Sequence, residues 1–157
     1  MNDWNQRLEL IVFNVISSLQ SIKINNETAV VFDIDDTLID SRGKRIDLVF
    51  FLYNYMKYLG IHLVLITNRI GTQESVQWTI DELFNNGITK YSCIYFRSPY
   101  REDNPYRYKE IARKSVLEKK GLTIIMSIGD QPWDIGNYGG IGILLPICPQ
   151  VQDNYFL

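Results

Sequence analysis

Three aspartates follow directly on an apolar segment of the sequence. Residues 29–32 read Ala-Val-Val-Phe, and Asp33, Asp35, Asp36 and Thr37 come next. Such a run is typical of a buried parallel strand that opens into a polar turn, where open α/β sheets bind ligands. Because Asp33 and Asp35 are two residues apart, the pleat predicts that both side chains point the same way. Their repulsion, about 4 kcal/mol at ~4 Å and an effective dielectric of ~20, favours a bound cation.

The side chains near these aspartates indicate which cation. Neither a histidine nor a pair of cysteines lies close to them in the sequence. Oxygen ligands alone suit a hard ion, most simply Mg²⁺. A lone Asp-x-Asp is more often a solvated acidic turn or a helix cap. Here a wholly apolar segment precedes it and matching residues recur downstream, so we interpret the aspartates as part of a magnesium site.

Four ordered motifs resemble those of the haloacid dehalogenase (HAD) superfamily of phosphohydrolases. The matching segments are residues 33–38, Thr67 with Asn68 and Arg69, Lys109 with Arg113, and residues 129–134. The residues of these segments are most similar to those of the acid phosphatase branch, subfamily IIIB, which includes plant vegetative storage proteins. The resemblance covers roughly residues 28–148, and it implies a phosphatase with the superfamily's fold.

The resemblance implies hydrolysis through an aspartyl-phosphate. Asp33 would be the nucleophile, and Asp35 would protonate the leaving oxygen and then activate water. Asp33, the backbone carbonyl of Asp35 and the side chain of Asp130 would bind Mg²⁺. Thr67 would hold the transferring phosphoryl group together with nearby N–H groups. Superfamily members that break carbon–halogen bonds lack the second acid, so Asp35 favours phosphoryl transfer.

The remaining motif residues would support this site. Lys109 lies in the first turn of an expected helix, although the basic residues that follow it could also be a solvated helix face. Asp134, one turn after Asp130, would hold a metal-bound water or Lys109. Asn68 could line the site, and Arg113 could support phosphate or a neighbouring acid.

The pattern of apolar residues predicts the elements that position these side chains. Helices are expected at about residues 3–21, 46–59, 72–87 and 104–121, and strands at about 29–32, 61–67, 91–97, 122–128 and 141–145. Strands that alternate with helices predict a three-layer α/β/α, Rossmann-like fold with a parallel sheet of about five strands. We expect a single phosphatase domain over residues 1–157, with an N-terminal helix in 1–27 and a catalytic core in 28–148.

Parallel strands joined by crossover helices place every strand-to-helix junction at one edge of the sheet. The sheet order of the resembled family would bring the first and fourth strands together, and with them Asp33 and Asp130. The connections after the first two motifs are short, which predicts a minimal cap domain or none, and an open site.

The segment 98–108 interleaves tyrosines with arginines close to the expected site. It is either a solvated loop anchored by its tyrosines or a platform for a nucleotide or a nucleic-acid end. In the second case Tyr100 and Arg101 would bind substrate. Leu10 and Phe13 fall off the apolar stripe of the first helix, so they either widen its buried face or contact a second copy of the chain as a homodimer.

The composition and net charge of the chain limit its expected partners and location. The chain has 157 residues, of which 46% are hydrophobic and 22% charged, and a net charge of −2. Such a charge gives no general attraction to nucleic acid or anionic membranes. The sequence shows no leader peptide and no membrane-spanning run, so we expect a cytoplasmic protein without membrane contact.

These observations predict a Mg²⁺-dependent phosphomonoester hydrolase that acts on a phosphorylated small molecule, a nucleotide or another phosphomonoester. One alternative is a polynucleotide 3′-end phosphatase, with a phosphorylated nucleic-acid end as its partner. Another is a catalytically silent storage or binding relative. Storage members of this branch can lack the nucleophile, so the presence of Asp33 counts against a catalytically silent protein.

Overall fold

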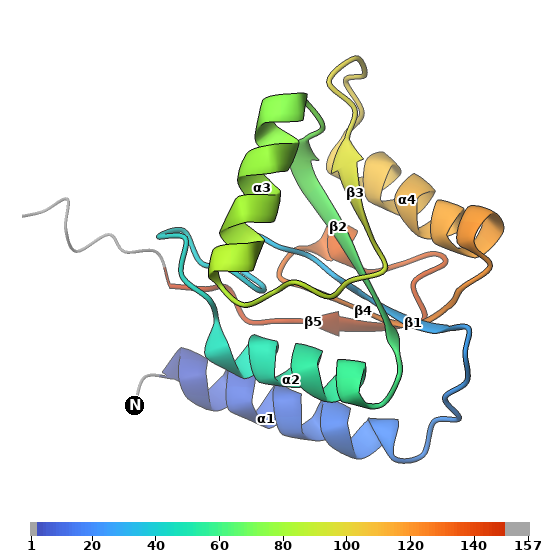
Figure 1. Cartoon of the computed structure of the whole chain (residues 1–157). Coiled ribbons are helices and arrows are strands. Elements are labelled where there is room, and N and C mark those ends of the chain that lie inside the picture. Colours follow the sequence, from blue (N-terminus) through green and yellow to red (C-terminus); the bar gives the residue numbers. More distant parts are fainter. Residues whose placement is uncertain (1–2, 150–157) are drawn as a thin grey trace, which may run out of the picture.

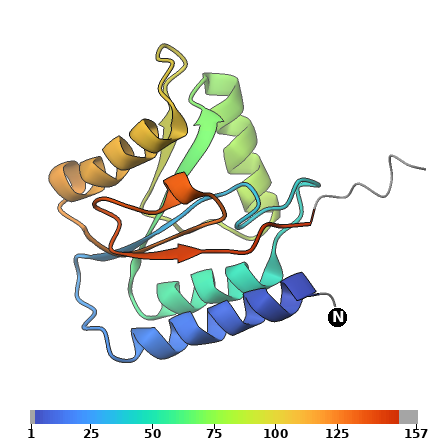
Figure 2. The ribbon, with the colours of Figure 1, turned by 180° about the vertical axis from the view of Figure 1, so that it is seen from behind.

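The computed structural model describes residues 3–149, and every strand in this range belongs to one parallel sheet with the order β3-β2-β1-β4-β5 (Figures 1 and 2). The strands are β1 (Thr28–Phe32), β2 (His62–Ile70), β3 (Cys93–Arg97), β4 (Thr123–Gly129) and β5 (Ile141–Leu144). The helices are α1 (Asp3–Leu19), α2 (Asp47–Tyr58), α3 (Gln73–Asn85), α4 (Pro105–Lys120) and the short 3₁₀ helix η1 (Pro132–Asp134). The predicted Rossmann-like α/β fold is confirmed, and one helix follows each of β1, β2 and β3.

Two hydrophobic cores lie on opposite faces of the sheet. Val30 and Phe32 of β1 pack in the core that α1 and α2 cover, to which Leu83 of α3 also belongs. Ala29 and Val31 face the other way, toward α4. Since successive side chains of a strand point to opposite faces, an apolar run is what a strand buried on both sides requires. The helices thus form the two outer layers of the fold.

Side-chain caps fix where two of the helices begin. The Thr72 hydroxyl accepts a hydrogen bond from the Ser75 N–H at the start of α3 (3.2 Å). Asn104 caps α4 by accepting from the Arg107 N–H (2.9 Å), and Pro105 occupies the first turn. Such caps satisfy N–H groups that have no partner within the helix. Both helices therefore start at the sheet edge where the preceding strand ends.

One expectation about α1 is wrong. Leu10 and Phe13 do not widen its buried face, because their side chains are 62% and 61% exposed. The helix buries Leu8, Val12 and Val15 against the core, which leaves the off-stripe residues on its outer side. Contact with a second copy of the chain stays a hypothesis, which a solution size measurement returning a monomer would remove.

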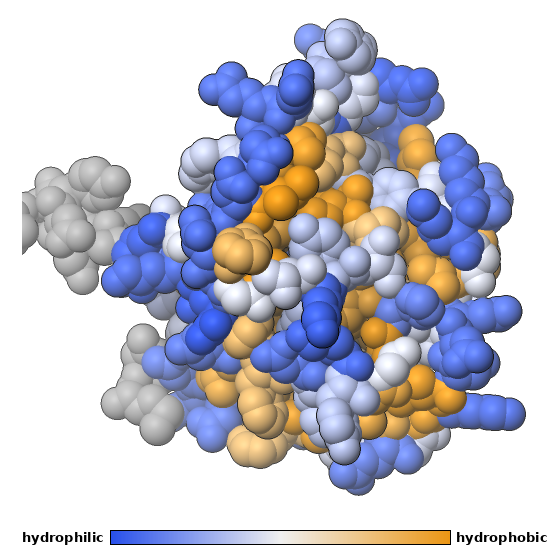
Figure 3. Space-filling model, in the orientation of Figure 1, coloured by the Kyte–Doolittle hydropathy of each residue, from blue (hydrophilic) through white to orange (hydrophobic). Residues whose placement is uncertain are grey.

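The face of the molecule seen in Figure 3 mixes polar and apolar side chains. In that view hydrophobic side chains gather between α3 and α4, over β2 and β3. β3 is an edge strand, and all of its residues are only partly buried. No helix between residues 3 and 149 combines the length and apolar character needed to cross a lipid bilayer.

Candidate active site

The pairing of β1 with β4 brings two distant aspartates together. Phe32 is in register with Ile128, and the Asp33 N–H donates to the Ile128 carbonyl (3.0 Å), so both strands end at the same level. The Thr37 hydroxyl lies 3.5 Å from Asp33 Oδ2 and 3.4 Å from Asp130 Oδ1. Asp33 and Asp130 therefore meet at the carboxyl edge of the two central strands.

A tight turn after β1 places Thr37 between the two carboxylates. The N–H groups of Thr37 and Leu38 both donate to the Ile34 carbonyl (3.2 and 2.9 Å). Asp36 adopts the left-handed conformation (φ 58°), which Asp tolerates better than most residues. The turn folds the hydroxyl of Thr37 back over the end of the strand, where it is fully buried.

Lys109 reaches the same edge from α4 on the other face of the sheet. Its Nζ donates to Asp33 Oδ1 (2.9 Å) and to the Ile66 carbonyl (2.6 Å), and it forms an ion pair with Asp134 Oδ1 (2.8 Å). The side chain is only 2% exposed. Burial acts to lower the pKa of Lys109, but the two carboxylates outweigh it and the pKa is raised. The amine is therefore a fixed positive charge beside Asp33.

The three buried aspartates form a group that could hold a metal ion. Asp33, Asp130 and Asp134 each offer a carboxylate oxygen, and these oxygens lie within 4.8 Å of one another. Burial raises the pKa of Asp33 well above its ordinary value, and Lys109 opposes this shift. The Lys109 amine contacts Asp33 and Asp134 but, within the described residues, forms no ion pair with Asp130, so the group of three carboxylates suits an additional hard cation with oxygen ligands.

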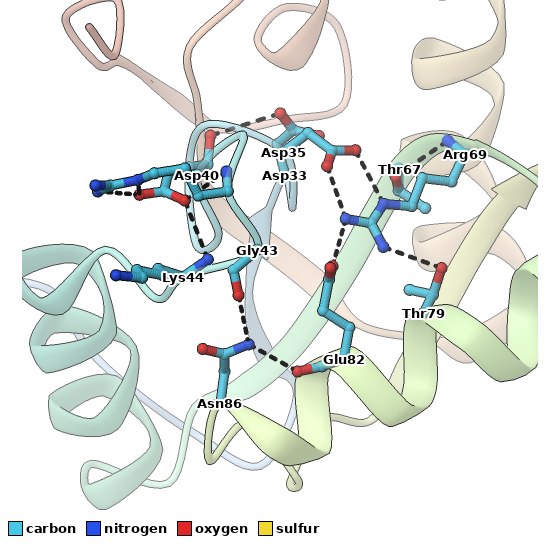
Figure 4. A network of polar contacts seen from close by, with 12 residues as sticks. Asp33, Asp35, Asp40, Gly43, Lys44, Thr67, Arg69, Thr79, Glu82 and Asn86 are labelled. Atoms are coloured by element: carbon cyan, nitrogen blue, oxygen red, sulfur yellow. Dashed lines mark hydrogen bonds and ion pairs between the residues drawn. The ribbon is translucent and has the colours of Figure 1, made fainter. Parts of the chain in front are cut away.

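The side chain of Asp35 does not join this group. It is 56% exposed, and its two oxygens accept from Nε and an amino group of Arg69 (3.0 and 2.7 Å; Figure 4). Arg69 also donates to Glu82 (2.7 Å) and Thr79 (3.2 Å) of α3. The positive partner of Asp35 is therefore an arginine of β2, and its two neighbours on α3 hold that arginine in place.

Three other residues that the sequence placed at the site, Thr67, Asn68 and Arg113, form hydrogen bonds that involve the backbone. Thr67 is fully buried, and its hydroxyl accepts from the Arg69 N–H (3.1 Å). Asn68 accepts from Arg97 Nε through its backbone carbonyl (3.1 Å). Arg113 donates to the backbone carbonyls of Trp133 and Asn137 (3.0 and 2.9 Å). Arg113 thus holds the loop that carries Asp134, and these two hydrogen bonds go to the backbone of that loop rather than to an acid.

Tyr100 and Arg101 lie away from the carboxylate group. Both are exposed, Tyr100 by 94%, and the loop that carries them projects beyond β3 and α4 (Figure 1). Tyr108, at the end of the same segment, is instead buried against β1 and β2. The structure therefore separates an anchoring tyrosine from exposed ones, and a contact of Tyr100 or Arg101 with substrate stays a prediction.

Sequence reasoning missed Thr37 and the pair of Arg69 with Glu82. Thr37 lies inside the first motif, but its position in the sequence alone does not show that its hydroxyl lies between Asp33 and Asp130. Arg69 follows Thr67 and Asn68 directly, and Thr79 and Glu82 share one face of a helix at a spacing of three. A charged residue just past a strand end, opposite an acid on the next helix, is the signal that could have found them.

Gly129 leaves the space that Asp134 occupies. A Cβ at this position would overlap the Asp134 side chain, so Gly129→Ala must displace it. Displacement also removes a partner of Lys109, and we expect the catalytic activity of the site to fall at least about 100-fold, as a misplacement of about 1 Å can cost. A Cβ at Gly121 would meet nothing within 4 Å, so Gly121→Ala is the control for backbone strain alone. Equal activity of the two variants would contradict this expectation.

Fold and geometry together define an α/β protein with a buried, lysine-paired carboxylate site at the end of its central strands. The sequence model of the HAD superfamily, subfamily IIIB (acid phosphatase), matches residues 41–145, and the chain belongs to this family. It is a phosphatase. The matched segment contains Thr67, Lys109 and Asp130, whereas Asp33 and Asp35 precede it.

Solved structures with the same fold include the class C acid phosphatase from Bacillus anthracis. It is 16% identical, with a TM-score of 0.64 over 92% of this chain and 76% of that one. Its structure with tungstate bound is 15% identical, with a TM-score of 0.69 over 93% and 78%. A search of curated protein sequences returned no match. At these identities the likeness supports the fold alone.

Proposed function

We propose that this phosphatase hydrolyses phosphomonoesters through an aspartyl-phosphate on Asp33 and uses Mg²⁺. The observation that carries the proposal is the placement of Asp33, which lies buried at the end of β1 within 4.8 Å of Asp130 and Asp134 oxygens. Lys109 contacts it directly (2.9 Å). The test is hydrolysis of a panel of sugar phosphates, nucleotides, phosphopeptides and phosphorylated oligonucleotides with and without Mg²⁺, with Asp33→Asn as the blank.

Each residue of the site has a role in the two steps. An Asp33 oxygen attacks phosphorus, the bond from phosphorus to the leaving oxygen breaks, and Asp35 gives that oxygen its proton. Asp35 then takes a proton from water, which attacks phosphorus and releases phosphate and Asp33. Lys109 orients Asp33 and favours its ionised form, and Thr67 holds the phosphoryl oxygens.

The carboxylate group is the proposed metal site. The side chains of Asp33 and Asp130, with the backbone carbonyl of Asp35, would hold Mg²⁺, and Asp134 would orient a ligand or Lys109. Phosphatases of this superfamily generally use a divalent metal, and the buried acids fit one. When bound, the ion would neutralise the acids and polarise a phosphoryl oxygen.

Binding of Mg²⁺ should depend on pH, because the burial that raises the pKa of Asp33 lets a proton compete with the cation. Below that raised pKa the carboxyl is protonated and must release its proton before it can bind. We expect the affinity for Mg²⁺ to fall by about tenfold for each pH unit in that range. Calorimetric titrations at several pH values measure this, and an affinity that stays constant down to pH 4 would contradict it.

Arg69 is expected to orient Asp35 for proton transfer. Arg69→Gln removes both bonds to that carboxylate, and the loss of orientation should lower kcat for alkyl phosphates by about 10- to 100-fold. p-Nitrophenyl phosphate should be affected less, since its leaving group departs without a proton. Arg7→Gln, at an exposed position of α1, is the control. A loss of the same size for both classes of substrate would contradict the role.

We propose a phosphorylated small molecule as the substrate class. The connections after β1 and β2 each hold one helix among the described residues, so the site is reached from the open edge of the sheet. A preference for phosphorylated oligonucleotides with a steep salt dependence would instead favour the polynucleotide end phosphatase.

A further inference from the structure

A pocket of about 500 Å³ opens directly beside Asp35, between residues 40–43 and α3. Its lining includes Asp35, Arg69, Glu82, Ser41, Arg42 and Trp78. We infer that this pocket receives the leaving group of the substrate and that it selects an uncharged, polyhydroxylated one, such as a sugar. The inference rests on the proposed function, since it assigns the group that departs when Asp33 takes the phosphoryl group.

The position of the pocket follows from the role of Asp35. A general acid must lie within hydrogen-bond reach of the leaving oxygen, so the leaving group extends from phosphorus on the Asp35 side. Asp35 lines the pocket, whereas Asp33, Asp130 and Lys109 do not. The carboxylate group therefore holds the phosphoryl end of the ester, and the pocket takes the alcohol end.

The pocket is already formed, because hydrogen bonds tie its two sides together (Figure 4). The Asn86 side chain donates to the Gly43 carbonyl (3.2 Å) and to the Glu82 carbonyl (2.9 Å), and accepts from the Arg45 N–H (3.1 Å). Asp40 accepts from the N–H groups of residues 42 and 44 (2.9 and 3.0 Å), which closes the loop on itself. A preformed pocket spends little binding free energy on ordering its walls.

The charges of the pocket disfavour a second anionic group. Arg42 donates to Asp40 Oδ2 through Nε and through an amino group (3.2 and 2.8 Å). Arg69 is held by Asp35 and Glu82 (both 2.7 Å). Both guanidinium groups of the lining are thus already paired with acidic residues, and the net charge of these five residues is −1 with Asp35 ionised and zero with Asp35 protonated. Carboxylate oxygens and serine hydroxyls can instead exchange hydrogen bonds with the hydroxyl groups of a sugar.

Trp78 supplies the apolar surface on which such a ligand could rest. Its side chain is 60% exposed, and the Arg69 guanidinium carbon lies 5.2 Å from its ring centroid. An indole combines a large apolar area with few rotatable bonds, and it suits the C–H face of a sugar ring. Trp78 therefore lies where its indole can pack against the leaving group, while the carboxylates and serines of the lining can form hydrogen bonds with the hydroxyl groups of that leaving group.

Three esters of primary alcohols test the inference: ethyl phosphate, glucose 6-phosphate and fructose 1,6-bisphosphate. We expect the KM of the wild-type protein to be lowest for glucose 6-phosphate. Trp78→Ala should raise that KM by about five- to tenfold and leave the KM for ethyl phosphate unchanged. Phe84→Ala, a second exposed aromatic of α3 outside the pocket, should change neither. Asp40→Asn releases Arg42 and should lower the KM for the bisphosphate.

Two kinetic results would overturn the inference. One is a KM for the bisphosphate at or below that for glucose 6-phosphate in the wild-type protein. The other is a Trp78→Ala variant that changes the KM values for ethyl phosphate and glucose 6-phosphate equally or not at all. Failure of the proposed function has a different signature, because no ester would then be hydrolysed. Isothermal titration calorimetry of Asp33→Asn with glucose 6-phosphate still measures binding to the pocket in that case. Saturable binding that is lost when Trp78→Ala is added supports the inference, and no binding to Asp33→Asn overturns it.

Discussion

Asp33→Asn is expected to lower kcat/KM for every phosphomonoester by at least about 10⁴-fold. The amide has nearly the shape of the carboxylate but cannot attack phosphorus to form an acyl phosphate. It also keeps an oxygen that can accept from Lys109, which lies 2.9 Å away in the native protein. The measurement is steady-state hydrolysis of p-nitrophenyl phosphate and of the preferred natural ester at saturating Mg²⁺.

A matched control separates this loss from any general effect of removing a negative charge. Asp47 is an exposed aspartate at the start of α2, and Asp47→Asn should retain wild-type activity. Thermal unfolding of both variants checks that each is folded. Activity of Asp33→Asn within tenfold of the wild-type protein would remove the nucleophile from the proposed mechanism.

Lys109→Met is expected to lower the free energy of unfolding by about 3–5 kcal/mol in the absence of divalent metal. Methionine has similar length but no charge, so the buried carboxylates of Asp33 and Asp134 would face each other without their common partner. Saturating Mg²⁺ should restore part of that loss, because a bound cation offsets the same charges. Urea unfolding with and without Mg²⁺ measures both effects, and phosphatase activity should fall in parallel.

The same substitution near the other end of α4 provides the comparison. Lys119 is exposed in the last turn of the helix, and Lys119→Met should change the free energy of unfolding by less than about 0.5 kcal/mol. If Lys109→Met were as stable as Lys119→Met without metal, the buried lysine would not be balancing the aspartates, and the electrostatic account of the site would be wrong.

Much of the fold could be predicted because its signals are local. The apolar run before Asp33, the Asn104-Pro105 start of α4 and the glycines past the helix ends each fix a boundary from a few residues. Alternation of strands and helices then brings all strand ends to one edge, which is why Asp33, Lys109 and Asp130 meet as expected.

Contacts set by tertiary packing could not be predicted in this way. The side chain of Asp35 was expected to point the same way as that of Asp33, toward one cation, but its carboxylate pairs with Arg69, and this depends on how β2 and α3 pack. Leu10 and Phe13 are hydrophobic residues of the kind found in protein cores. They are exposed only because α1 packs against the core through a different face. Their positions follow from long-range geometry, which local patterns of residues do not encode.

The most direct test of the account is to trap the intermediate. Rapid quenching of the enzyme with substrate and Mg²⁺, followed by mass spectrometry of its peptides, should show one phosphoryl group on Asp33. The adduct should be removed by hydroxylamine, as an acyl phosphate is, and should be absent from Asp33→Asn. A phosphoryl group on another residue, or full turnover with no adduct at any quench time, would contradict attack by Asp33.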